Sequence, residues 1–240
     1  DPTILGVANQ LRAMSIAFDS TPAALPRQAV LEVRPYYNPE RRTPVNIVPG
    51  LMGIILMMTM MLFTAVAIVR ERERGNLELL INTPVSAAEL MIGKVTPYVA
   101  IGLLQLAIIL GAGMLLFDVP VRGSIVDLYV AGSAFIGANL ALGLLISTAT
   151  HTQFQAMQVT VFILMPSILL SGFMFPFDGM PKIAQYIGEA LPTTHFIRLT
   201  RGIMLRDASI GELGKDFYFL IGFTLVAMTI AALRFSKRLD

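Results

Sequence analysis

Five long runs of apolar residues constrain this chain more than any other feature of its sequence. At ~1.5 Å per residue in a helix, each run is long enough to cross a hydrocarbon core of roughly 30 Å. A spanning segment must satisfy its own backbone hydrogen bonds in lipid, which favours helices. We therefore expect an all-α polytopic membrane protein with five transmembrane helices, at about residues 47–69, 95–117, 125–148, 156–175 and 217–235.

The low charge content agrees with lipid as the main solvent. Only 14% of the 240 residues are charged, whereas an ordinary soluble domain has about 25%. The formal net charge is +2, and the basic residues lie at the ends of apolar runs and form no phosphate-binding patch, so nucleic acid is excluded as a partner. The sequence contains no cysteine, which excludes disulfides and cysteine metal sites, and we expect no bound metal.

The first 46 residues have a different character from the rest. Apolar residues recur every three or four positions in residues 3–18, which predicts an amphipathic helix, and alternation in residues 29–34 indicates a short strand. About forty residues rarely bury enough surface to fold alone. We expect residues 1–46 to be the remnant of an extracytoplasmic domain with its linker, and residues 47–240 to form the transmembrane domain. The opening at Asp1 predicts further sequence upstream.

The most polar part of the transmembrane region lies between the first two spans, in residues 70–94. It begins with five consecutive charged residues, Arg70, Glu71, Arg72, Glu73 and Arg74. If the first span continues as a helix through them, opposite charges three positions apart pair Arg70 with Glu73 and Glu71 with Arg74. A segment this polar next to two apolar runs must lie at a membrane surface.

Helix-breaking residues divide the remainder of this segment. Gly75 can end the continued first helix, and Asn76 can then cap a short helix with an apolar face. Pro84 ends that short helix, after which a capping box at residues 86–89 opens the helix of the second span. A helix held between two spans in this way could pass force from a soluble partner to the membrane. The alternative is an ordinary solvated loop whose arginines only set topology.

Basic residues at the ends of spans predict the orientation of the chain. One group lies between the first two spans and another follows the last span: Arg70, Arg72, Arg74 and Lys94, then Arg234, Lys237 and Arg238. The positive-inside rule places both groups, and so the C-terminus, in the cytoplasm. The N-terminal region and residues 178–216, in which acidic and basic residues balance, are then expected outside.

Three further patterns concern packing. Ser133, Gly137 and Ala141 repeat every four residues in the third span, which predicts a surface where another helix packs closely. The first span is rich in methionine, which favours adaptable packing over a substrate-lining surface. Residues 180–190 and 194–205 predict two short amphipathic helices that lie in the interface or re-enter it.

The 70–94 segment resembles the cytoplasmic signature of ABC-2 type permeases, the membrane subunits of a class of ATP-driven exporters. IVRERERGNLELLINTPVSAAELMIGK follows that family's order of charged elbow, glycine, acidic residue, threonine-proline break and glycine-lysine. NPERRTPVNIVPG before the first span and LLSGFMFPFDGMPKIAQYIGEALPTTHFIRLTRGIML after the fourth agree with it. Asn76 replaces a frequent threonine but keeps its capping ability. The family's first membrane helix and most of its external domain are absent from this sequence.

The resemblance implies a multidrug-export-like permease of the bacterial inner membrane that forms half of a dimeric pathway for an amphipathic or lipophilic solute. It implies a second permease copy or a related permease as partner, and a separate ATPase subunit that uses ATP and Mg²⁺, while this chain binds no cofactor. A periplasmic adaptor is a further candidate partner. The residues expected to act in coupling and gating are Arg70, Glu71, Arg72, Glu73, Arg74, Gly75, Glu78, Pro84 and Lys94.

Other classes of function fit the sequence less well. A GxxxxGK[ST] phosphate loop would need glycine where Ala88 stands and Ser or Thr where Val95 stands, so no ATPase site is expected here. His151 and His195 belong to no HExxH pattern and are expected to be plain interfacial side chains on opposite sides of the membrane. An ion-coupled secondary transporter is the stronger rival, although the span centres lack the ionisable residues that ion coupling requires. A non-transporting receptor or scaffold is the third class.

Overall fold

The computed structural model describes residues 6, 9–10, 12, 43–75 and 87–234. The chain divides into two compact units, Asp1–Arg42 and Thr43–Asp240. The strand expected at residues 29–34 lies outside the described residues, as does most of the helix expected at residues 3–18. The short helix expected between Asn76 and Pro84 also lies outside them.

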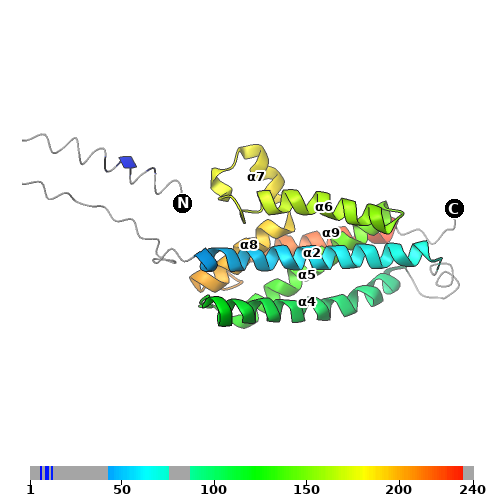
Figure 1. Cartoon of the computed structure of the whole chain (residues 1–240), viewed down its shortest axis with the longest axis horizontal. Helices are drawn as coiled ribbons and strands as arrows, with labels where there is room; N and C mark the ends of the chain where they lie inside the picture. The colour runs from blue at the N-terminus through cyan, green and yellow to red at the C-terminus, as the bar shows by residue number, and fades with distance from the viewer. Residues whose placement is uncertain (1–5, 7–8, 11, 13–42, 76–86, 235–240) are drawn as a thin grey trace, which may run out of the picture. The chain divides into compact units, whose positions relative to one another are not determined.

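Five long helices of the second unit correspond to the five predicted spans (Figure 1). They are α2 (Thr43–Glu73), α4 (Ala87–Phe117), α5 (Ile125–Ala149), α6 (Gln153–Leu170) and α9 (Gly214–Arg234). Each contains a stretch that is long and apolar enough to cross a membrane. The chain is therefore an all-α polytopic membrane protein, and no strand occurs in the parts of the chain that the structure describes.

The fourth span is displaced from its predicted position. The sequence predicts residues 156–175, whereas α6 covers Gln153–Leu170. The helix begins earlier because the hydroxyl of Thr152 accepts a hydrogen bond from the Gln155 backbone N–H at 3.2 Å and so caps the first turn. It ends earlier because Gly172 adopts φ of 80°, a left-handed conformation that does not continue a helix.

Helices α2 and α5 form the centre of the bundle. In their most apolar stretches, 61% of the residues of α2 and 72% of those of α5 are buried, against 22%, 22% and 17% for α4, α6 and α9. Helix α5 touches all the other long helices, and α2 touches α4, α5 and α6. The three outer helices therefore present most of their apolar surface away from the bundle, as lipid-facing helices do.

The two central helices approach each other closely at Gly143 of α5. A Cβ atom at this position would lie 2.7 Å from the carbonyl oxygen of Met61 and 2.8 Å from Cβ of Thr64, both on α2. Contacts this short with backbone atoms cannot be relieved by turning a side chain. Glycine is thus required for the observed separation of α2 and α5.

Methionine side chains of α2 fill space along its contacts with the other helices. Met52, Met57, Met60 and Met61 are fully buried, whereas Met58 is exposed. An unbranched thioether fits irregular gaps between helices. The structure thus favours packing over a substrate-lining surface for the four buried methionines.

Two shorter helices lie between α6 and α9. After the 3₁₀ helix η1 (Phe177–Gly179), α7 (Lys182–Glu189) lies at one end of the bundle and α8 (Pro192–Arg206) packs among α2, α5 and α9 (Figure 1). Phe196 of α8 stacks on Phe135 of α5 with ring centroids 4.2 Å apart, and both rings are buried. Of the two placements predicted for this segment, interfacial or re-entrant, α8 fits the second because it is packed within the bundle.

Substituting Gly143 tests the close approach of the central helices. We expect Gly143→Ala to force α2 and α5 apart and to lower the stability of the folded protein by about 1–3 kcal/mol, the usual cost of overpacking. Gly222→Ala is the matched control, because a Cβ at Gly222 would meet no atom of the described residues within 4 Å. Thermal unfolding of both variants in detergent measures the difference. Equal unfolding temperatures would show that the close contact at Gly143 does not determine stability.

Candidate functional site

The predicted coupling residues that the structure describes lie where α2 leaves the bundle. Helix α2 ends at Glu73, and Gly75 then adopts φ of 71°, the left-handed conformation that ends a helix, as the sequence predicts. The start of α4 and the connection from α5 to α6 lie at this same end (Figure 1). We call this region, residues 70–75 with their partners on α4, α5 and α6, the charged end. Glu78 and Pro84 lie outside the described residues.

Glu71 forms an ion pair with Lys94, which joins α2 to α4. Both side chains are partly withdrawn from solvent, with 35% of Glu71 and 22% of Lys94 exposed. Salt screens such a pair less than it screens a fully exposed pair. Beside the pair lies a cavity of about 350 Å³ between the two helices, which also touches both charged side chains.

Arg72 connects α2 to the last turn of α5. Its Nη1 donates hydrogen bonds to the carbonyl oxygens of Ser147 at 3.1 Å and Thr150 at 3.0 Å. The last carbonyls of a helix have no partner within the helix, and a positive charge is favourable at a helix C-terminus. Arg72 therefore satisfies two backbone acceptors and complements the dipole of α5.

Glu73 connects α2 to the first turn of α6. The backbone N–H of Gln153 donates to Oε1 of Glu73 at 2.9 Å, and the Gln153 side-chain amide donates to the other carboxylate oxygen. The first N–H groups of a helix lack partners within the helix, and a negative charge is favourable there. Three consecutive residues of α2 thus bind three different helices.

These interhelical contacts replace the pairs predicted within α2. Among the described residues, no ion pair joins Arg70 to Glu73 or Glu71 to Arg74, and both arginines are exposed. Exposed pairs three positions apart contribute only about 0.2–0.5 kcal/mol, whereas Lys94 and the unpaired backbone groups of α5 and α6 offer partners on neighbouring helices. The sequence could not reveal these partners, because backbone groups have no side-chain signature.

The predicted packing stripe of the third span has mixed surroundings. A Cβ at Gly137 would lie 3.5 Å from a methyl carbon of Thr224 on α9, and Ala141 is fully buried. Ser133 is exposed, and its hydroxyl donates to the carbonyl of Tyr129 in its own helix at 2.7 Å. Contact with α9 is thus made at Gly137, while a packing role for Ser133 stays a prediction.

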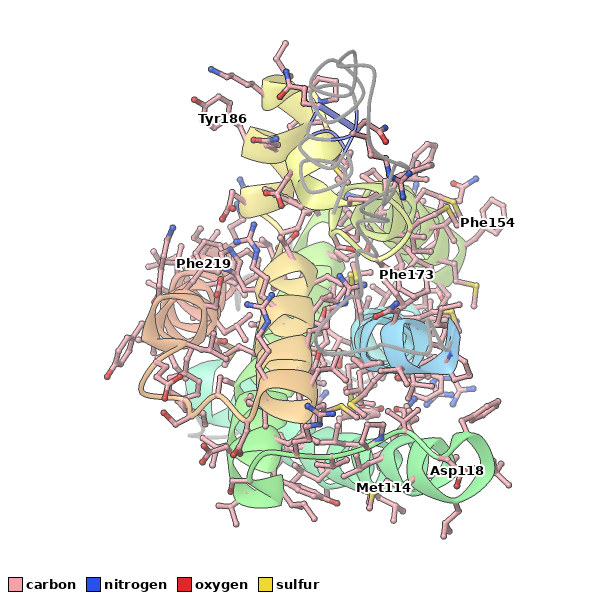
Figure 2. All side chains as sticks on the ribbon, turned by 90° about the vertical axis from the view of Figure 1, so that its left-hand side faces the viewer. Met114, Asp118, Phe154, Phe173, Tyr186 and Phe219 are labelled. Atoms are coloured by element: carbon pink, nitrogen blue, oxygen red, sulfur yellow. The ribbon has the colours of Figure 1, made fainter. Side chains whose placement is uncertain are left out.

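A second polar cluster, at the opposite end of the bundle, contains His195. His195 is 2% exposed; its Nδ1 lies 2.6 Å from Oδ1 of Asp216, and its Nε2 lies 2.9 Å from the carbonyl oxygen of Glu189. The ring stacks on Phe219 of α9, at the end seen in Figure 2, with centroids 3.7 Å apart. His195 is thus a buried side chain with specific partners, whereas its expected place at the membrane interface stays a prediction.

Arg198 completes this cluster. Its Nη2 donates to Oε1 of Glu189 at 2.6 Å, and its Nη1 lies 3.6 Å from Oδ1 of Asp216. The bond from Arg198 holds the pKa of Glu189 below its usual value. Burial alone lowers the pKa of Arg198, but its two carboxylate partners outweigh burial and raise it. The spacing of His195 and Arg198 indicates one helix face, but nothing in the sequence links that face to Glu189 or Asp216.

This second cluster ties α7, α8 and α9 together and has no evident chemical role. Among the described residues, no group of three or more His, Cys, Asp or Glu side chains is placed to hold a metal ion. The cluster pairs each charge with an opposite charge or a hydrogen-bond partner, which is what buried ionisable groups require. We interpret it as a structural link.

Comparison with known proteins gives consistent matches along the chain. A family profile described as "ABC-2 family transporter protein" matches residues 2–233. The chain is 32% identical over 211 residues to "Probable multidrug ABC transporter permease YbhS" of Escherichia coli (strain K12), covering 88% of this chain and 56% of the relative. "Inner membrane transport permease YhhJ" of the same organism is 32% identical over 219 residues, covering 86% and 56%.

A more distant relative comes from a eukaryote. "ABC transporter G family member 20" of Dictyostelium discoideum is 26% identical over 207 residues, which cover 85% of this chain and 28% of that protein. The chain spans about half the length of the bacterial relatives it matches.

The link between Arg198 and Glu189 predicts a pH dependence of stability. Because the pKa of Glu189 is lowered in the folded state, its contribution is complete above the unfolded value of about 4.3 and is lost as the pH falls through the folded value. In Glu189→Gln, we expect the unfolding temperature to fall less between pH 6 and pH 3 than in the wild type. Asp178→Asn, at an exposed position, is the control, and identical pH profiles for Glu189→Gln and wild type would contradict the link.

Proposed function

Because the chain belongs to the ABC-2 family of transporter proteins, we propose that it is the permease subunit of an ATP-driven exporter. In this role it forms the pathway for an amphipathic or lipophilic solute across the bacterial inner membrane. The printed names of the relatives, a probable multidrug permease and an inner membrane transport permease, support this proposal. The sequence given has no GxxxxGK[ST] loop, so the proposal assigns ATP and Mg²⁺ to a separate ATPase subunit.

The observation that carries the proposal is the triple connection at the charged end. Glu71 holds α4, Arg72 holds α5 and Glu73 holds α6. The chain runs from this point directly into residues 76–86, the proposed docking segment for the ATPase. Movement of that segment would pull on the end of α2, and the three contacts would pass the movement to three further spans as a rigid-body shift. A loop without such contacts would move alone.

The distribution of charge supports an orientation with the charged end in the cytoplasm. Arg70, Arg72, Arg74 and Lys94 gather there, and α9 ends there at Arg234 (Figure 1). The opposite end, with α7 and α8, carries both signs of charge. In the proposed assembly, residues 1–46 belong outside and a second permease, identical or related, completes the pathway. The names of the relatives mention no periplasmic adaptor, and the proposed assembly does not require one.

An ion-coupled secondary transporter is the alternative, and one observation favours it. His195 and Asp216 form a buried ionisable pair, of the kind that marks proton pathways in membrane proteins. Asp216, however, lies in the first turn of α9, at the end of a span, and also faces Arg198. An ion-coupling pair would be expected near mid-membrane, so the exporter remains the better supported proposal.

Reconstitution with the ATPase subunit tests coupling. We expect the permease to copurify with an ATPase and to export its solute when ATP is present, even after the proton gradient is collapsed. In Arg72→Ala, loss of a charge-assisted contact should lower export per ATP hydrolysed about tenfold, while the exposed Arg70→Ala serves as the matched control. No ATPase in the complex, or export driven by the gradient alone, would defeat the proposal, and equal export by the two variants would remove Arg72 from coupling.

Cysteine labelling tests the orientation, because the sequence has no cysteine of its own. Ala149 is exposed beside the connection from α5 to α6 at the charged end, and Gly179 is exposed at the opposite end. The two test variants are therefore Ala149→Cys and Gly179→Cys. A membrane-impermeant thiol reagent added outside intact cells should label Gly179→Cys only. Labelling of Ala149→Cys from outside would reverse the proposed topology.

A further inference from the structure

The cavity between α2 and α4 has an apolar wall and a charged end. Its apolar lining consists of Ala67, Ile68, Val95, Pro97 and Ile101, with the ring of Tyr98 beside them. Glu71 and Lys94 also line the cavity. Glu71 lies nearer to the C-terminus of α2, and Lys94 nearer to the N-terminus of α4, than the apolar lining residues do. The cavity is therefore amphipathic along the helix axes, with both signs of charge at the membrane surface.

A buried hydroxyl beside this cavity lacks a hydrogen-bond partner. Thr64 lines the cavity and is 1% exposed, and its Oγ1 has no hydrogen-bond partner among the residues that the structure describes. Hydroxyls elsewhere in the spans, such as those of Thr59, Thr160 and Thr224, donate to a carbonyl of the preceding turn. A buried hydroxyl without a hydrogen-bond partner is unfavourable. Thr64 therefore indicates that a hydrogen-bond acceptor belongs in the cavity.

The depth of the cavity matches the boundary between lipid headgroups and acyl chains. The charged residues 70–74 mark the membrane surface, and Thr64 lies roughly 10 Å deeper along α2 at ~1.5 Å per residue. A phospholipid changes over this distance from a charged headgroup through ester carbonyls to hydrocarbon. The groups that line the cavity come in the same order as the groups of a phospholipid: charged side chains first, then a hydroxyl among apolar side chains.

We propose that this cavity binds the headgroup and upper acyl chain of a zwitterionic aminophospholipid of the phosphatidylethanolamine type. The lipid phosphate pairs with Lys94, and the ammonium group of the lipid pairs with Glu71. Two ion pairs with the lipid thus replace the ion pair between Glu71 and Lys94. An ester carbonyl accepts the Thr64 hydroxyl, and the acyl chain lies along the apolar wall. The volume of about 350 Å³ falls within the ~300–1,000 Å³ typical of small-molecule sites.

The paired charges determine which lipid fits. A purely anionic headgroup would meet the carboxylate of Glu71, and like charges at close range oppose binding. A choline headgroup carries the right charges but has no N–H with which to donate to that carboxylate. The site therefore favours ethanolamine over choline and over anionic glycerol headgroups.

This inference is separate from ATP-driven transport. Binding requires only that α2 and α4 cross a bilayer, and only the assignment of the site to the cytoplasmic leaflet rests on the proposed function. An occupied site would also place a lipid within the link between α2 and α4.

Native mass spectrometry of the purified protein, titrated with lipids of identical acyl chains, tests the proposal. We expect phosphatidylethanolamine to bind about tenfold more tightly than phosphatidylglycerol, because a tenfold difference in affinity corresponds to about one charge-assisted contact. We expect it to bind severalfold more tightly than phosphatidylcholine. Glu71→Gln, which removes the carboxylate that pairs with the ammonium group, should abolish the preference over phosphatidylglycerol. Thr64→Val, which keeps the shape of the side chain, should weaken phosphatidylethanolamine binding about fivefold, and Thr160→Val, on α6 and away from the cavity, should leave it unchanged.

Each outcome decides the proposal. Equal binding of the three lipids, a preference for phosphatidylglycerol, or no difference between Thr64→Val and Thr160→Val would overturn it. If Glu71→Gln does not fold, the Thr64→Val comparison still decides. If the protein exports solute with ATP but shows no lipid preference, only the proposed lipid site is contradicted. If it shows the lipid preference but no export, only the proposed function is contradicted.

Discussion

The contact between α2 and α5 is the interaction on which the rest of the bundle depends. Lipid is as apolar as the helix surfaces, so spans associate through close packing and not through a hydrophobic driving force between them. Because Gly143 has no side chain, the backbone of α5 can pack directly against α2 at this position. Buried methionines fill the remaining gaps. The other spans and α8 then assemble on this central pair, and their positions follow from it.

The charged side chains that link different helices gather at the two ends of the bundle, and their contacts differ in kind. At the charged end, side chains of α2 bind mainly the unpaired backbone groups of helix ends, which link α2 to its neighbours without requiring buried charges. At the opposite end, ionisable side chains bind one another within a packed environment. The first arrangement joins the end of α2 to three other spans, as the proposed coupling requires, while the second fastens α8 to the elements around it.

Much of the architecture was predictable from local signals. The number of spans follows from apolar length, and the end of α2 follows from Gly75, whose φ of 71° suits glycine. The ends of α6 were less predictable, because the cap by Thr152 and the turn at Gly172 compete with hydrophobicity as boundary signals. The contacts of Arg72 and Glu73 were not predictable, since their partners are backbone groups far away in the sequence. The burial of His195 was missed for a similar reason.

The sequence by itself determined the class of protein, the number of spans, the polar segment between the first two and its resemblance to ABC-2 permeases. These properties depend on residue type and short-range spacing, which are fully present in one dimension. Only the tertiary structure decided that α8 is packed within the bundle, that Glu71 pairs with Lys94, and that a cavity with an unpaired Thr64 hydroxyl lies beside them. Those features depend on which helix faces meet, and that depends on packing between segments distant in sequence.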